Sequence, residues 1–290
     1  MKPRDICLAA CPPLFWVIGL TAAKPAVAHF PPIFMMTMVY ALTAVALFWT
    51  RKPRRTPLWA IFVIAAIGSA IQNALLFTGL TQLPASTAML VVQTQVPFAV
   101  LAAWVIGKEQ LSLGRWIGIV IAFAGVALVI GAPEASSAYL SLAFVVLAGL
   151  LWAVSQAMVR VFSRDDGRTL TLALCLFAAP QSLIISLLLE DGQWASLQSA
   201  SFESWGAFAL MVLFGYIFAY MIWYHLLGRF RIDQVTPFLL LMPPLGVVAG
   251  ALFLGEHISL AVIVGAAVII AGLAVIVRTP ALRVEAVEET

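Results

Sequence analysis

The chain has 290 residues, of which 63% are hydrophobic and only 10% are charged. Soluble domains carry about 25% charged residues, so the composition excludes a soluble protein and predicts an integral membrane protein whose main partner is the lipid bilayer. The net charge of +3 is small and gives no indication of nucleic-acid binding. Three cysteines, Cys7, Cys11 and Cys175, lie in apolar segments and are interpreted as small apolar side chains, not as metal ligands.

The apolar segments, taken in chain order, predict ten transmembrane helices. A helix needs about 20 apolar residues to cross the hydrocarbon core. The first segment follows Lys2 and Arg4 but is interpreted as a membrane helix and not as a cleaved signal, because further apolar spans follow at once. The predicted spans are 6–23, 31–50, 58–81, 85–106, 113–131, 138–161, 169–189, 203–226, 234–254 and 259–277.

The distribution of lysine and arginine predicts the orientation of these helices. With ten alternating spans, all but one of the 16 basic residues fall on the same side of the membrane, and the exception is Lys24. The positive-inside rule places that side, and with it both termini, in the cytoplasm. One missed helix would scramble this alternation, so the charge bias also supports the number of spans.

The two halves of the chain resemble each other in sequence. One fixed offset aligns the later helices of the two halves and brings Pro97 onto Pro244. A slightly shorter offset aligns the first helix of each half and brings Trp16 onto Trp152. Each half has five spans, so the second half enters the membrane from the opposite side. Such inverted repeats are typical of secondary transporters, whose substrate site lies at the repeat interface. The predicted units are a first repeat, 1–133, a second repeat, 134–278, and a disordered cytoplasmic tail, 279–290.

Each half also has an acidic residue between its fourth and fifth helices, Glu109 and Glu256, followed by two spaced glycines. These features resemble the drug/metabolite transporter superfamily, and in particular its EamA-type ten-helix exporters, over nearly the whole chain. Within that group the chain is most similar to the bacterial exporters of aromatic amino acids. The resemblance implies an inner-membrane protein that exports aromatic and other apolar amino acids by alternating access through a central cavity.

Polar and aromatic residues at membrane depth are the candidate substrate contacts, because polar groups rarely face lipid. One face of the third span is rich in amides, whereas the matching face of the eighth span is rich in aromatic rings. Such a cavity suits a molecule with a polar end and an apolar end, although interhelical hydrogen bonds and aromatic packing would use the same residues. The predicted substrate-binding residues are Trp16, Gln72, Asn73, Gln93, Trp152, Gln156, Tyr216 and Tyr220.

Prolines interrupt the fourth and ninth spans, where a missing backbone donor is expected to kink the helix. The predicted hinges are Pro97, Pro243 and Pro244. Gln93 and Gln95 precede the first of these prolines, whereas the second half has Leu240 and Met242 in the matching positions. The kink is therefore interpreted as architectural, and the glutamines as substrate contacts of one half, with Gln93 expected to matter more than Gln95.

No acidic or basic residue falls in the middle of a predicted span, so a central carboxylate that relays protons is not expected. The sequence also lacks a nucleotide-binding loop, a metal-ligand cluster and a catalytic triad, and thus predicts no cofactor, no metal and no enzyme. Small residues on the fifth and tenth spans predict close helix packing within a monomer or across a homodimer. The alternatives are an exporter of lipophilic drugs or other metabolites and, in a different class, a membrane receptor or scaffold.

Overall fold

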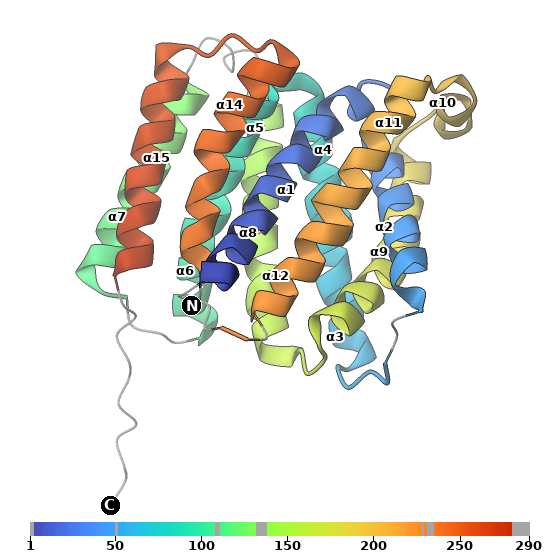
Figure 1. Cartoon of the computed structure of the whole chain (residues 1–290), viewed down its shortest axis with the longest axis horizontal. Helices are drawn as coiled ribbons and strands as arrows, with labels where there is room; N and C mark the ends of the chain where they lie inside the picture. Colours follow the sequence, from blue (N-terminus) through green and yellow to red (C-terminus); the bar gives the residue numbers. More distant parts are fainter. Residues whose placement is uncertain are drawn as a thin grey trace, which may run out of the picture.

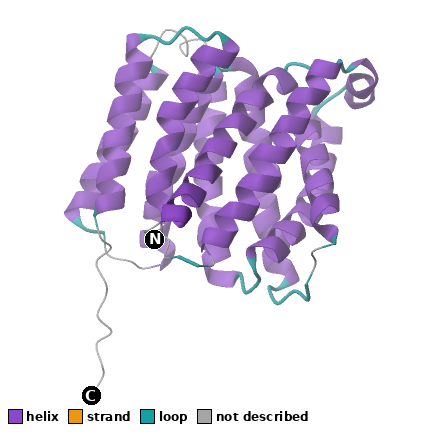
Figure 2. Ribbon diagram, viewed as in Figure 1, coloured by secondary structure: helices purple, strands orange, loops and turns teal. Residues whose placement is uncertain are grey.

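The structure is a computed structural model that describes residues 3–49, 52–107, 111–131, 138–227, 229–230 and 235–279. Every regular element in these ranges is a helix (Figure 2). Within the described residues, nine helical segments are long and apolar enough to cross a membrane, and the shorter apolar helix Pro32–Phe48 occupies the place of the predicted second span. The prediction of ten membrane-spanning segments in an all-helical protein is thus confirmed.

The spans of the first half are interleaved with those of the second half in Figure 1. In chain order they consist of α1 (Pro3–Val27), α2 (Pro32–Phe48), α3 (Leu58–Ala65) with η1 (Ala66–Ile71) and α4 (Gln72–Gln82), α5 (Ala85–Val91) with η2 (Val92–Thr94) and α6 (Gln95–Gly107), and α7 (Leu113–Ile130).

The spans of the second half complete the bundle, and α7 and α15 form one of its edges (Figure 1). They consist of α8 (Tyr139–Phe162), α9 (Gly167–Leu189), α11 (Phe202–Leu210) with η3 (Met211–Phe218) and α12 (Ala219–Leu227), η4 (Thr236–Leu241) with α14 (Met242–Leu254), and α15 (Leu260–Arg278). A short helix, α10 (Gln193–Ser199), lies in the connection before α11.

Four spans are not regular α-helices, and their irregular segments occur in matching places of the two halves. The third and eighth spans contain the π-helical segments η1 and η3, which include Gly68 and Gly215. The fourth and ninth spans contain the 3₁₀ segments η2 and η4, each followed at once by an α-helix. Matching irregularities of this kind support the relation between the halves that the sequence indicates.

The prolines that were expected to kink the fourth and ninth spans lie just after the 3₁₀ segments. Pro97 is in the first turn of α6, and Pro243 and Pro244 are in the first turn of α14. A proline is tolerated there because the first turn needs no backbone donor, whereas a proline deeper in a helix would remove one. The change of helix type therefore comes one turn before the prolines, and their role as hinges stays a prediction.

The small residues of the fifth and tenth spans bring α7 and α15 into close contact. A Cβ atom on Gly118 would lie 2.9 Å from the carbonyl oxygen of Gly272, and one on Gly272 would lie 2.4 Å from the backbone nitrogen of Ala122. Small residues allow such an approach of two helix backbones within a membrane. Since these faces are covered within the chain, a homodimer would have to use another surface.

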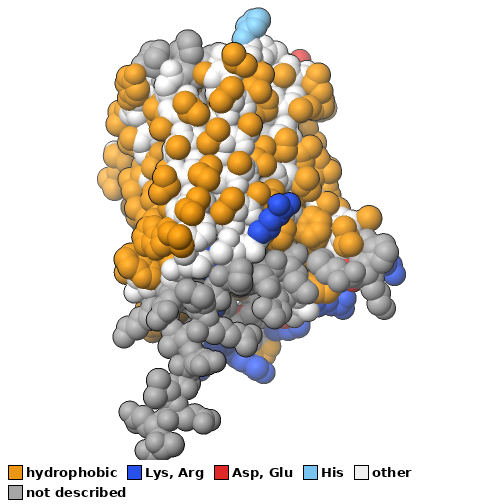
Figure 3. Space-filling model, turned by 90° about the vertical axis from the view of Figure 1, so that its left-hand side faces the viewer, with side chains coloured by type: hydrophobic (Ala, Val, Ile, Leu, Met, Phe, Trp, Pro, Cys, Tyr) orange, Lys and Arg blue, Asp and Glu red, His pale blue; other side chains and the backbone are white. Residues whose placement is uncertain are grey.

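Basic side chains gather toward one end of the bundle, while its sides are covered with hydrophobic side chains (Figure 3). This basic end includes Lys52, Arg55 and Arg164 in the connections between spans. Asp165 accepts hydrogen bonds from the backbone N–H groups of Arg55 and Thr56, at 2.6 and 3.1 Å. The connections that follow the second and sixth spans are thereby joined.

Asp166, which lies at the basic end, is expected to make the stability of the fold depend on pH. A hydrogen bond of 2.7 Å from Lys52, together with one from the Thr169 N–H, lowers the pKa of Asp166 from 3.8 to about 2. A carboxyl group with a lowered pKa stabilises the fold above its ordinary pKa, and this contribution is lost as the pH falls from 3.8 toward 2. Asp166→Ala also removes the cap of α9, so we expect it to cost about 1 kcal/mol at pH 7.

Thermal unfolding in detergent micelles, followed by circular dichroism from pH 7 to pH 2, measures this effect. The difference between wild type and Asp166→Ala should be complete at neutral pH and should shrink below pH 3.8. The matched control is Asp191→Ala, which removes an exposed carboxylate at the other end of α9. A stability difference between wild type and Asp166→Ala that does not depend on pH would contradict a lowered pKa of Asp166.

Candidate functional site

A cavity of about 100 Å³ lies inside the bundle, between helices of both halves. Its walls come from α1, α4, α6 and α8, from η3 and α12, and from η4. The side chains that line it include Trp16, Asn73, Gln95, Trp152, Tyr216, Tyr220 and Trp223. Among the described residues that line this cavity, none carries a charge.

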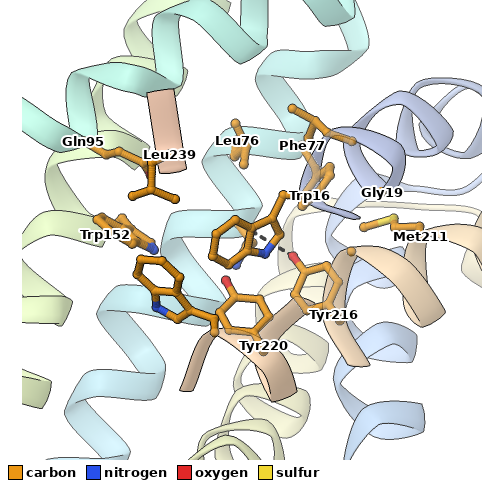
Figure 4. A pocket seen from close by; sticks show the side chains of 14 residues that line it. Trp16, Gly19, Leu76, Phe77, Gln95, Trp152, Met211, Tyr216, Tyr220 and Leu239 are labelled. Atoms are coloured by element: carbon orange, nitrogen blue, oxygen red, sulfur yellow. Dashed lines mark hydrogen bonds between the residues drawn. The ribbon is translucent and has the colours of Figure 1, made fainter. Parts of the chain in front are cut away.

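Aromatic rings make up much of the cavity wall (Figure 4). The ring centroid of Trp16 lies 5.5 Å from that of Tyr220 and 5.4 Å from that of Trp223, both in edge-on geometry. Tyr216 and Tyr220 lie 5.7 Å apart. The three residues Tyr216, Tyr220 and Trp223 follow one another at helical spacing, so a single helix face supplies this aromatic wall.

Asn73 is the centre of a hydrogen-bond network beside the cavity. Its Nδ2 donates to the hydroxyl of Tyr40 at 2.7 Å, and its Oδ1 accepts from the hydroxyl of Tyr216 at 3.2 Å. Tyr40 in turn donates to the Ser69 carbonyl at 3.0 Å. The amide of Asn73 is therefore already bonded at both ends, and it holds Tyr216 in place from α4.

Tyr40→Phe tests this network. The change removes the hydroxyl that links Asn73 to the Ser69 carbonyl and leaves a buried amide hydrogen without its acceptor, which costs about 1–3 kcal/mol. We expect a lower thermal midpoint in detergent. Tyr139→Phe is the matched control, because Tyr139 is 63% exposed. Equal midpoints for the two variants would contradict the role given to Tyr40.

The helices that surround the cavity cross at small residues in or beside the π-helical segments. A Cβ atom on Gly19 of α1 would lie 2.4 Å from the Cα of Gly215 in η3. In the matching crossing, a Cβ on Gly68 of η1 would lie 2.2 Å from the Cβ of Ser155 in α8. Because π-helical turns often occur at functional sites, these two crossings agree with the position of the cavity.

The predicted site residues fall into two groups. Those that line the cavity are Trp16, Asn73, Trp152, Tyr216 and Tyr220, and those outside its lining are Gln72, Gln93 and Gln156.

Of the two glutamines before Pro97, Gln93 was expected to lie nearer the substrate, but Gln95 is the one that lies at the cavity wall. Gln95 lines the cavity, whereas Gln93 is 1% exposed and is not part of the lining. The prediction assumed the turn angle of an α-helix, but η2 has three residues per turn and rotates the side chains around the axis. Whether either glutamine contacts substrate stays a prediction.

Lys24 closes the end of the bundle that lies opposite the basic end. A helix leaves its last carbonyl groups without backbone donors, and a lysine can satisfy them. The Nζ atom of Lys24 does so at the end of α4, donating to the carbonyl oxygens of Leu80, Thr81 and Leu83 at 2.8, 3.2 and 2.7 Å.

Glu256 binds the other side of the same turn. Its carboxylate accepts hydrogen bonds from the backbone N–H of Ala85, from the N–H of Ser86 at 3.0 Å and from the Ser86 hydroxyl. A carboxylate is favourable at a helix N-terminus, which here is the start of α5. The turn between α4 and α5 is thus held by Lys24 from the first half and by Glu256 from the second.

The ten spans, the matching irregularities of the two halves and an uncharged internal cavity between them define a polytopic membrane transporter. The chain belongs to the EamA-like transporter family, whose sequence profile matches residues 4–131 and 139–278. Membership of this family makes the protein a transporter and not an enzyme. It also removes the support for a receptor or scaffold.

Individual relatives agree with this assignment. A probable amino-acid metabolite efflux pump of Salmonella typhimurium is 27% identical in an alignment of 286 positions that covers 94% of each chain. A probable terminal-alkyne amino-acid exporter of Streptantibioticus cattleyicolor is 27% identical and covers 79% of this chain and 76% of its own. A crystal structure with 18% identity superposes with a TM-score of 0.66 over 95% of this chain and 96% of the other, and it supports the fold alone.

Proposed function

We propose that the protein exports aromatic and other apolar amino acids across the bacterial inner membrane. The observation that carries the proposal is the central cavity, whose wall is built from the rings of Trp16, Trp152, Tyr216 and Tyr220 and from no charged residue. Aromatic walls suit an apolar side chain, and amide and hydroxyl groups can meet a zwitterionic head without forming ion pairs. The names of two relatives, a probable amino-acid metabolite efflux pump and a probable terminal-alkyne amino-acid exporter, support the same substrate class.

The proposed mechanism is alternating access between two inverted five-helix repeats. The basic end faces the cytoplasm, together with both termini, and the turn held by Lys24 and Glu256 closes the outer end. Export requires that this outer end opens after the inner end has closed. The 3₁₀ segments and the prolines that follow them, Pro97, Pro243 and Pro244, are the proposed hinges.

The proposed transport is downhill and needs neither a cofactor nor a metal. Proton-coupled transporters use titratable carboxylates or histidines within the membrane, and no such side chain lines this cavity. Flux should therefore follow the substrate gradient and should not change when the proton gradient is collapsed. The protein acts as a monomer in this proposal, with a homodimer as the alternative.

Counterflow into liposomes that contain the purified protein tests the proposal. L-phenylalanine, L-tryptophan and L-leucine should enter and compete with one another, whereas L-glutamate and L-lysine should do neither, because the cavity offers no partner for a charged side chain. Failure of the apolar amino acids to enter or compete would end the proposal. Uptake of lipophilic drugs in their place would establish the alternative substrate class.

A further inference from the structure

Gln95 brings a side-chain amide to the cavity wall, and one end of that amide is unused. Its Nε2 donates to the Oε1 of Gln93 at 3.3 Å. Its Oε1 makes no hydrogen bond within the described part of the chain, and the residue is half-buried at the cavity. An acceptor is therefore available to a molecule in the cavity.

Gln93 lies behind Gln95 and has a hydrogen-bonding group without a partner. Its side chain is 1% exposed, and its Nε2 has no hydrogen-bond partner among the described residues. A buried amide hydrogen without an acceptor costs free energy, so its retention at this position calls for an explanation. Its position directly behind a cavity residue suggests a role in the arrangement of that residue.

The two amides can exchange roles without losing a hydrogen bond. The oxygen and nitrogen ends of an amide have nearly the same shape. If both side chains turn over, Gln93 Nε2 donates to Gln95 Oε1, and the NH₂ group of Gln95 faces the cavity. The pair can thus present either an acceptor or a donor to the same point, and in each arrangement one buried atom of Gln93 stays unpaired.

We propose that Gln95 binds the polar head of the transported amino acid and that Gln93 is its positioning residue; this inference rests on the proposed export of amino acids. An amino acid has an ammonium donor and a carboxylate acceptor close together, and the cavity holds no opposite charge for either. Gln95 and Trp152 lie on one side of the cavity, and Tyr216 lies on the other (Figure 4). A head at Gln95 therefore directs the side chain toward the aromatic wall.

The second half of the chain supplies suitable substitutions for a test. Leu240 and Met242 occupy the positions that match Gln93 and Gln95, and they also lie at a 3₁₀ segment followed by an α-helix. Gln93→Leu and Gln95→Met thus place side chains that this backbone already accommodates. The matched control is Gln181→Met, because Gln181 is a glutamine of α9 that donates to the Phe62 carbonyl and does not line the cavity.

The experiment measures L-phenylalanine uptake into liposomes for each variant. Loss of a hydrogen bond to a charged group should raise the KM of Gln95→Met about tenfold with little change in kcat. Gln93→Leu should raise KM roughly threefold, but should have no further effect when Gln95 is already methionine, because coupled residues are not additive. A purely structural role of Gln93 would add to the effect of Gln95→Met. Gln181→Met should match wild type.

Competition by two analogues identifies the group that Gln95 binds. Phenethylamine lacks the carboxylate, and 3-phenylpropionate lacks the ammonium group. Wild type should bind L-phenylalanine more tightly than either analogue, and Gln95→Met should lose this preference. Gln95→Glu keeps the shape but can only accept hydrogen bonds, so it should keep phenethylamine as a competitor and lose 3-phenylpropionate.

Two different failures can be told apart. If wild type transports L-phenylalanine and the folded Gln95→Met and Gln95→Glu variants keep its KM and the preference over the analogues, the inference is wrong and the proposed function stands. If wild type neither transports L-phenylalanine nor changes its tryptophan fluorescence on adding it, the proposed function is wrong and the inference falls with it. Three of the nine tryptophans, Trp16, Trp152 and Trp223, line the cavity, so binding there should change the tryptophan fluorescence.

Discussion

Gly19→Ala is expected to lower the thermal midpoint strongly and to abolish transport, although it adds only one carbon atom. That atom would lie 2.4 Å from the Cα and 2.9 Å from the nitrogen of Gly215, and backbone atoms of a packed helix cannot turn aside as a flexible side chain can. Helices α1 and η3 would have to move apart. Overpacking of this kind typically costs about 1–3 kcal/mol, and here it also changes the wall of the cavity.

Gly206→Ala is the matched control for this clash. Gly206 is also a helical glycine, in α11 of the same span as Gly215, but a Cβ added there would meet nothing within 4 Å. Alanine favours a helix over glycine by up to about 1 kcal/mol, so this variant should be as stable as wild type or more stable. Thermal unfolding and L-phenylalanine flux, measured for both variants, test whether the clash with Gly215 causes the effect of Gly19→Ala. Equal behaviour of the two would contradict the close crossing of α1 and η3.

The number and order of the spans could be predicted because the bilayer imposes a length and a composition on every membrane helix. The distribution of basic residues supported the same number of spans, and the orientation that it predicts stays a prediction. The length and composition of a segment do not reveal short helices. The connection between 189 and 203 contains α10, whose seven residues are too few and too polar to give a periodic signal. The second span also ends earlier than expected, at Phe48.

Residues that line the cavity could be predicted from the sequence where one half of the chain could be compared with the other. Trp16 and Trp152 match each other, as do Asn73 and Tyr220, and all four line the cavity. The second helices of the two halves differ too much in sequence for such a comparison. Tyr40, which completes the network around Asn73, lies in that region and was missed for this reason.

The direction of a side chain, when it was predicted from the geometry of an ideal α-helix, was less reliable near the irregular segments. A π-helical or 3₁₀ turn rotates every later side chain relative to an α-helix. Gln72 directly follows η1, and Gln93 lies within η2, and neither lines the cavity, whereas Gln95 does. Sequence patterns identify which polar residues lie at membrane depth, but their direction depends on backbone irregularities that packing against neighbouring helices decides.

Glu256→Ala is expected to have the second large effect, because it releases the end of the bundle that lies opposite the basic end. The carboxylate accepts three hydrogen bonds from Ala85 and Ser86 at the start of α5, while Lys24 holds the end of α4 on the other side of the turn. Hydrogen bonds to a charged group contribute more than neutral ones, and we expect a loss of about 2 kcal/mol at this partly exposed site. Glu256→Gln keeps one carbonyl acceptor, so its effect should be intermediate.

The reactivity of the Lys24 amine measures that release, because the residue is half-buried and its amine donates to three carbonyl groups. An amine-reactive reagent, followed by mass spectrometry, should label Lys24 faster in Glu256→Ala than in wild type, while labelling of the exposed Lys52 stays the same. Glu203→Ala, which removes an exposed carboxylate in the first turn of α11, is the control and should change neither rate.

Alternating access adds a further consequence for flux. If the outer end must open in each cycle, weaker closure should favour the outward-open form, so Glu256→Ala should speed the release of substrate and slow its capture from the inside. Net efflux requires the empty transporter to return to the inward-open form, whereas counterflow does not, so the ratio of efflux to counterflow should fall, with a lower thermal midpoint. Unchanged Lys24 labelling together with an unchanged flux ratio would show that the contacts of Glu256 do not hold the outer end closed.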